Sequence, residues 1–202
     1  MKAVWMCTTV VAAALIIAGG IYGSHLTEYG LSAREEPTAV ERFVARTLRH
    51  AAIPATAKGL KNPLPATPEM LEHGRNHWAD HCATCHANNE SGDTMIGKNF
   101  YPKAPDMRLP PTQSLTDGEL YYIIRNGVRM TGMPAWGNPQ DGDLDHETWM
   151  LVLFIRHLPQ VTSEEEHEMQ KLNPKTAADR EEEQREEDFL NGTTSKEVTH
   201  EH

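Results

Sequence analysis

Apolar and polar positions divide the chain into four stretches. The first, from Ala3 to Ser24, has 22 residues without a charge, which is long enough to cross the ~30 Å hydrocarbon core of a bilayer as a helix. A cleavable secretory signal is the alternative, with Ala18-Gly19-Gly20 as a small-residue cleavage site, but the apolar run continues beyond that site. Residues 1–24 are therefore predicted to be a signal anchor or transmembrane helix that places the rest of the chain outside the cytoplasm.

The second stretch, residues 25–65, is predicted to hold an amphipathic helix followed by a linker. Apolar residues recur at helical spacing across residues 35–52, and residues 35–37 suit a first helical turn. Three basic side chains share one face of this helix: Arg42, Arg46 and Arg49. The helix has three possible partners: the domain that follows, an anionic membrane surface or another protein. Prolines and a glycine between residues 54 and 67 indicate the linker.

The third stretch, residues 66–160, has the pattern of a small helical domain. Capping residues and apolar spacing predict three helices: Glu69 to about His81 with Thr67 as N-cap, Thr116 to Gly127 opened by a capping box, and Thr148 to Leu158 capped by Asp145 and ended by Pro159. Between the first two helices, residues 87–114 contain few apolar residues and many turn formers. That segment is expected to be a loop that wraps around something.

The charge of the chain is concentrated in its fourth stretch. The formal net charge is −10, and residues 161–202 alone hold 13 acidic and 5 basic residues. No block of Lys and Arg occurs anywhere, which disfavours nucleic-acid binding. Residues 161–202 also contain few large apolar residues, so they are predicted to be a disordered acidic tail or a frayed charged helix.

One motif carries specific chemistry, and it reads Cys82-Ala83-Thr84-Cys85-His86. Two thiols at this spacing can form thioethers to the vinyl groups of a haem while the adjacent imidazole reaches the iron. A structural zinc site would need a second ligand pair, and the chain has no further cysteine downstream. A thioredoxin-like redox pair belongs in a βαβ context, whereas these surroundings are predicted to be helix and loop.

The second axial ligand of such an iron is expected to be Met133. It lies between Gly132, which allows a close backbone approach, and Pro134, which stiffens the loop. Met130 is a secondary candidate, and Met150 is more simply explained as core. The remaining candidates are histidines: His73, His77, His81 and His146.

Taken together, these residues resemble class I c-type cytochromes, specifically monohaem, membrane-anchored bacterial ones. The matching positions are Gly74, Trp78, Cys82, Cys85 and His86, then the segments Asp117–Gly127 and Gly132–Gly137, and finally Trp149 to Pro159. The resemblance implies an all-α, cytochrome c-like haem domain over residues 66–160, with one covalently attached haem c. It also implies that Gly74 lies where the first and last helices cross, that Trp78 packs beside Trp149 or Leu153, and that the carbonyl of Pro102 or Pro105 orients His86.

The expected function is single-electron transfer by a haem with His86 and Met133 as axial ligands, without enzymatic turnover by the chain itself. The alternatives are a structural haem subunit of a larger membrane oxidoreductase, or a gas-binding or peroxidatic haem with an open sixth site. Redox proteins at the membrane are the expected partners, and the expected location is the cell inner membrane, single-pass, with the haem domain on the periplasmic side. Basic residues in segment 94–133 are candidates for steering a partner, whereas the acidic pattern from Asp141 to Glu147 is too short for a calcium loop.

Overall fold

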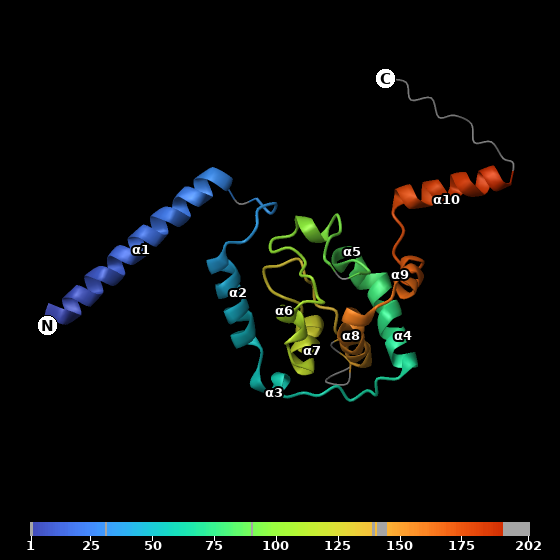
Figure 1. Ribbon diagram of the computed structural model, residues 1–202, viewed down its shortest axis with the longest axis horizontal. Coiled ribbons are helices and arrows are strands. Elements are labelled where there is room, and N and C mark those ends of the chain that lie inside the picture. The colour runs from blue at the N-terminus through green and yellow to red at the C-terminus, as the bar shows by residue number, and fades with distance from the viewer. Residues whose placement is uncertain (1, 31, 90, 139, 141–144, 192–202) are drawn as a thin grey trace, which may run out of the picture.

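The computed structural model describes residues 2–30, 32–89, 91–138, 140 and 145–191 (Figure 1). All regular structure in these residues is helical, as the sequence predicts. The α-helices are α1 (Lys2–Tyr29), α2 (Ala39–Ala52), α3 (Ala55–Lys58), α4 (Pro68–His77), α5 (Ala83–His86), α6 (Pro110–Gln113), α7 (Asp117–Asn126), α8 (His146–His157), α9 (Ser163–Gln170) and α10 (Ala177–Leu190). Shorter turns are the π-helical η1 (Trp78–Cys82) and the 3₁₀ segments η2 (Gly97–Asn99) and η4 (Leu158–Gln160).

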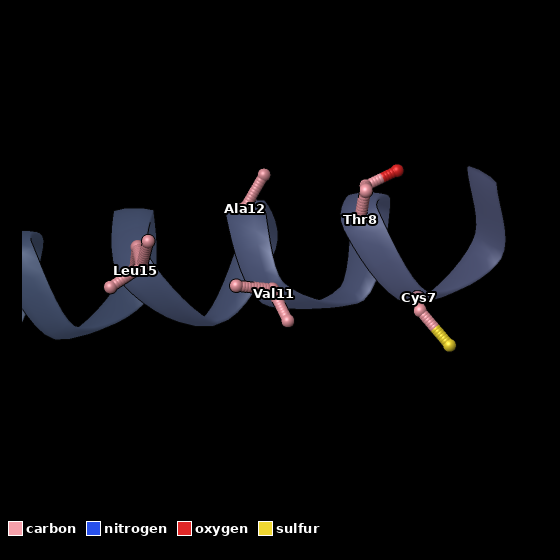
Figure 2. Close-up of a pocket in the computed structure, with 5 residues that line it drawn as sticks. All are labelled: Cys7, Thr8, Val11, Ala12 and Leu15. Atoms are coloured by element: carbon pink, nitrogen blue, oxygen red, sulfur yellow. The ribbon is translucent and has the colours of Figure 1, made fainter. Parts of the chain in front are cut away.

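Helix α1 extends away from the other helices (Figure 1), and its segment Trp5–His25 is long and apolar enough to cross a membrane. None of that segment is buried within the protein. Figure 2 shows the side chains around a shallow, mainly apolar hollow on α1: Cys7, Thr8, Val11, Ala12 and Leu15. A secretory signal sequence passes the same test of length and composition, so the test identifies an apolar N-terminal helix of either kind.

Helix α2 begins later than the sequence pattern predicts. The expected first turn at residues 35–37 is not helical, and the helix starts at Ala39. The reason is a capping box: the Thr38 hydroxyl accepts from the Glu41 N–H at 3.2 Å, and the Glu41 carboxylate accepts from the Thr38 N–H at 2.7 Å.

The core of the domain is formed mainly by α4, α7 and α8, with α4 and α7 each packing against α8. The N-caps Thr67, Thr116 and Asp145 are confirmed, and α7 ends at Gly127, whose φ is +67°. Helix α8 begins at His146, two residues before the expected start. The Asp145 side chain accepts a hydrogen bond from the Thr148 N–H and so caps a first turn that includes residues 146–148.

Trp78 lies in the buried core, and its two aromatic neighbours are Phe154 of α8 and His86 of the motif. Its indole ring lies 5.8 Å from the ring of Phe154 and 5.7 Å from that of His86, measured between centroids. Trp149 instead stacks on Tyr121 at 4.1 Å, so this tryptophan joins α8 to α7. Trp149 and Phe154, on successive turns of α8, therefore contact different helices. The apolar spacing of α8 alone does not show which residue contacts which helix.

The segment expected to be a linker packs against the domain. Ala57 of α3 is buried, and a Cβ at Gly118 would lie 1.9 Å from its carbonyl oxygen. The Asn62 amide donates to the carbonyl of Trp149 at 2.9 Å, while Leu60 also packs against the core. Because prolines break this segment into short pieces, its contacts are made without a long helix.

The region after the last core helix is also more ordered than its composition predicts. Helix α9 packs against η1, and its Met169 is fully buried in the core. The expectation of disorder or a frayed helix is therefore wrong for residues 163–173. The Met169 side chain is buried in the core, and the Asn173 amide donates a hydrogen bond to the carbonyl of Ala79. Helix α10 has no buried residue and projects from the domain as a charged helix (Figure 1), while residues 192–202 lie outside the described part.

Candidate haem-binding site

The two cysteines and the histidine of the motif lie on one continuous helical stretch. Helix α4 passes into the π-turn η1, which ends at Cys82, and α5 then carries Cys85 and His86. In η1 the N–H of Ala83 donates to the carbonyl of Trp78, an i→i+5 bond that inserts one extra residue into the helical turn. Such turns occur often at functional sites, and here the turn leads directly into the motif.

The surroundings of the His86 imidazole determine its protonation state. Burial lowers its pKa to about 4, an effect that the backbone carbonyl of Pro105 partly opposes. The ring is therefore neutral at pH 7, which is the form that binds a metal ion. Its Nδ1 atom is buried and has no hydrogen-bond partner of ordinary geometry among the described residues. Of the two prolines expected to orient His86, Pro105 is the one whose carbonyl affects the ring.

The thiols have the opposite character from a metal-binding or catalytic thiolate pair. Burial, with a smaller effect of Cys85, raises the pKa of Cys82 to about 12, and burial also raises the pKa of Cys85. Both cysteines are free, and no cluster of three metal-ligating side chains occurs in the described part of the chain. A thioredoxin-like pair depends on a stabilised thiolate, and burial of these two thiols works against that form.

The backbone after His86 is tightly held. Ala87 adopts a φ of +65°, which is unfavourable for a residue with a Cβ. Its N–H donates to the carbonyl of Ala83 at 2.8 Å, and its carbonyl accepts from the Trp78 indole at 3.1 Å. The His86 carbonyl in turn accepts from the Gly92 N–H at 3.0 Å. These contacts turn the chain sharply away from the motif.

Met133 lies at the end of a short hydrogen-bonded loop. Its carbonyl accepts from the Val128 N–H at 3.0 Å, and its own N–H donates to the Thr131 hydroxyl at 3.1 Å. A Cβ at Gly132 would lie 2.7 Å from the Phe100 ring, so this glycine is needed where the loop meets the segment that precedes Pro105. The loop thus has a defined shape in which the partly buried Met133 is held on both sides.

The competing ligand candidates differ in exposure. Met130 is 92% exposed and has a positive φ, which leaves it away from the interior. Met150 is half-buried on α8, where its backbone carbonyl faces Gly74. His77 is half-buried, and its ring lies 4.8 Å from that of the exposed His81. His73 and His146 are exposed.

A ring contact joins the turn η1, which leads into the cysteine motif, to the loop that contains Met133. The rings of His81 and Trp136 form a T-shaped pair with their centroids 5.6 Å apart, and Trp136 lies three residues after Met133. Sequence reasoning missed Asn173, whose amide donates to the carbonyl of Ala79 at 2.7 Å and to the Asn88 side chain at 3.1 Å. Only the polar pair Asn88 and Asn173 could have signalled this contact, and 85 residues separate them.

The basic residues near the site are mostly paired with acids. Of the five basic residues in segment 94–133, four form ion pairs: Lys98 with Asp93, Lys103 with Glu36, Arg108 with Asp106, and Arg125 with Asp145. This arrangement favours scattered surface charge over a steering patch. Of the acidic pattern near α8, Asp141 and Asp143 lie outside the described residues, whereas Asp145 caps the helix.

The helical fold and the cysteine–histidine motif support a c-type cytochrome domain of the monohaem, class I-like kind, and such a domain implies haem c and an electron-transfer role. Residues 69–155 match the family model described as cytochrome c oxidase, cbb3-type, subunit III. No curated protein matches the chain. The matched segment begins in α4 and ends in α8, so it includes every residue of the candidate site named in the sequence motif.

Proposed function

We propose that the protein is a membrane-anchored electron carrier that holds one haem c through Cys82 and Cys85, with His86 and Met133 as axial ligands. The observation that carries this proposal is the motif's position on one helical stretch with a partly buried, neutral His86 ring, whose Nδ1 atom is fully buried. The match of residues 69–155 to a cytochrome family model supports the same conclusion.

The residues fit this cofactor in three ways. The buried Nδ1 of His86 leaves a polar atom that needs the nearby Pro105 carbonyl or an equivalent acceptor once the other ring nitrogen binds iron. The protonated thiols suit thioether formation better than thiolate–metal bonding. The hydrogen-bonded loop restrains Met133, so that its thioether can serve as a fixed neutral ligand.

When bound, the haem supplies a one-electron iron couple. Two filled axial positions leave no open coordination site, and this is why the chain is proposed to carry electrons without turning over a substrate. Helix α1 would hold the domain at the outer face of the cytoplasmic membrane, with redox proteins at that membrane as partners.

Absorption spectra of the full-length protein, made with periplasmic haem-attachment machinery, test the proposal. We expect a low-spin reduced spectrum, colour that survives acid–acetone extraction, and a weak long-wavelength sulfur-to-iron band in the oxidised form. Met133→Ala is expected to abolish that band, whereas the matched control Met130→Ala, at an exposed position, keeps it. A band that survives Met133→Ala would contradict the ligand assignment, and loss of colour on extraction would contradict covalent attachment.

A second candidate function is that of a haem subunit in a larger membrane oxidoreductase. The observation that favours it is the description of the matching family model, which names an oxidase subunit. Extraction from native membranes in mild detergent distinguishes the two: stable co-migration with other subunits supports the subunit role, and a lone chain supports a diffusing carrier. Binding of carbon monoxide to the reduced native protein would instead favour the open-site, gas-binding or peroxidatic alternative.

A further inference from the structure

Helix α2 presents an apolar face that no described part of the chain covers. Four side chains form this face, and between 45% and 71% of each is exposed: Val40, Phe43, Val44 and Leu48. They follow the i, i+3, i+4, i+8 spacing of one helical stripe. A contiguous exposed stripe of this kind indicates a binding surface.

The other side of α2 is attached to the cytochrome domain. His50 Nδ1 lies 2.9 Å from the carboxylate of Glu119, which is buried at the start of α7. Arg49 is half-buried, and Ile53, directly after the helix, is almost fully buried. Because these contacts hold α2 against the domain from one side, the apolar face is turned outward.

The N-terminal end of α2 is tied to the loop beside the candidate site. Glu36 pairs with Lys103, and Glu41 hydrogen-bonds with the Tyr101 side chain. The same loop continues to Pro105, whose carbonyl acts on His86. Helix α2 is therefore connected to the loop beside His86. If α2 binds a surface, its position sets the orientation of the candidate haem site relative to that surface.

The position of α1 restricts what that surface can be. Nine residues, 30–38, separate α1 from α2, and a chain of that length reaches at most ~30 Å. In Figure 1, α2 lies between α1 and the rest of the domain. If α1 crosses a bilayer, α2 is close to its surface wherever the domain turns.

We propose that α2 lies in the interfacial region of the bilayer that α1 crosses, with Val40, Phe43, Val44 and Leu48 toward the acyl chains. This inference rests on the membrane anchor in the proposed function. An amphipathic helix with a charged polar face and low overall hydrophobicity is typical of such a position. Residues 39–52 hold three arginines and one glutamate, a net +2, so anionic lipid strengthens the contact.

The test places a spin label on each side of α2 in the full-length haem protein. Val44→Cys labels the apolar face, and the matched control Ala45→Cys labels an adjacent exposed position on another face. Both carry Cys7→Ala so that the label has one target. The proteins are reconstituted into vesicles of phosphatidylcholine with phosphatidylglycerol, and collision rates with oxygen and with a water-soluble nickel complex give the depth of each label.

We expect the Val44→Cys label to be accessible to oxygen and protected from nickel, and the Ala45→Cys label to be accessible to nickel. Equal nickel access at both positions, in protein that floats with the vesicles, would overturn the interfacial helix but leave the anchor intact. Protein that does not float would overturn the anchor and the interfacial helix together. Protection at Val44 with spin–spin broadening that disappears on dilution with unlabelled protein would show a second copy on this face and would also overturn the proposal.

Discussion

Gly74 lies where the backbone of α4 approaches α8. A Cβ at this position would be 2.3 Å from the carbonyl oxygen of Met150 and 3.1 Å from the Cβ of Phe154. The obstacle at 2.3 Å is backbone, so it cannot move aside as a flexible side chain can. The absence of a side chain here determines how closely the two helices pack.

Gly74→Ala is therefore expected to destabilise the protein by about 3 kcal/mol, because α4 and α8 must separate to admit the methyl group. Gly59→Ala is the matched control, since a Cβ there meets only ordinary contacts at 3.7 and 3.8 Å. Denaturant unfolding of the purified haem protein measures both. Equal stability of the two variants would contradict the close crossing.

Single residues also show where prediction from sequence stops. The resemblance to class I c-type cytochromes predicts the helix crossing at Gly74, and the close approach of the Met150 carbonyl confirms it. The contacts of Trp78, the positive φ of Ala87 and the amide contacts of Asn173 depend on segments far apart in the chain. No local pattern encodes them, because each forms only after the helices have packed.

Among the helices, α9 is the one whose role differs most from its composition. Its first turn contains three glutamates, yet Met169 is fully buried and Arg75 of α4 pairs with Glu168 at 3.0 Å. Helix α9 packs against η1, the turn that leads into the cysteine motif. A segment with the composition of an acidic tail thus packs against the turn that carries Cys82.

Met169→Ala is expected to lower the free energy of unfolding by about 2–3 kcal/mol, because it leaves a cavity between α9 and the core. Met95→Ala provides the control, since that side chain is 80% exposed and its loss has little effect. Both variants are compared by thermal unfolding of the haem protein. If residues 163–170 were a disordered tail, the two variants would be equally stable.

Element boundaries were predictable where a capping side chain marked them. Thr67, Thr116 and Asp145 each cap the helix expected from the sequence. The start of α2 was misplaced because acidic residues before Pro37 resemble a first turn, whereas the Thr38 capping box fixes the true one. The sequence does not predict helix α3, because four residues between Pro54 and Gly59 are too few to show a helical period.

At the scale of the whole molecule, stability depends on pH through partly buried titratable groups such as His77. His77 lies 3.9 Å from Glu147, measured from its Nδ1 to the carboxylate, and its ring lies beside that of His81. Burial is the main cause that lowers its pKa below the ordinary value of 6.5, and His81 adds to it, while Glu147, Asp80 and Asp145 oppose it. The unfolded chain therefore takes up a proton at this residue before the folded chain does.

Stability is expected to fall as the pH drops below 6.5, because protonation of His77 then favours the unfolded state. The contribution is absent above that pH and cannot exceed about 1.4 kcal/mol per pH unit for one proton. His77→Gln should reduce the loss between pH 7.5 and 5.5, measured by urea unfolding. His73→Gln, an exposed position on the same helix, should leave it unchanged, and an equal effect of both variants would contradict the assignment.

The π-turn at Trp78–Cys82 acts like a one-residue insertion that the fold has retained. An α-helix advances by about 100° per residue, so removing one residue from this turn would restore regular winding and rotate everything beyond it by that angle. Cys85 and His86 would then point to a different side of the helix from the one they now face. The number of residues in this turn therefore determines which side of the helix Cys85 and His86 face, whatever side chain stands at the exposed position Asp80.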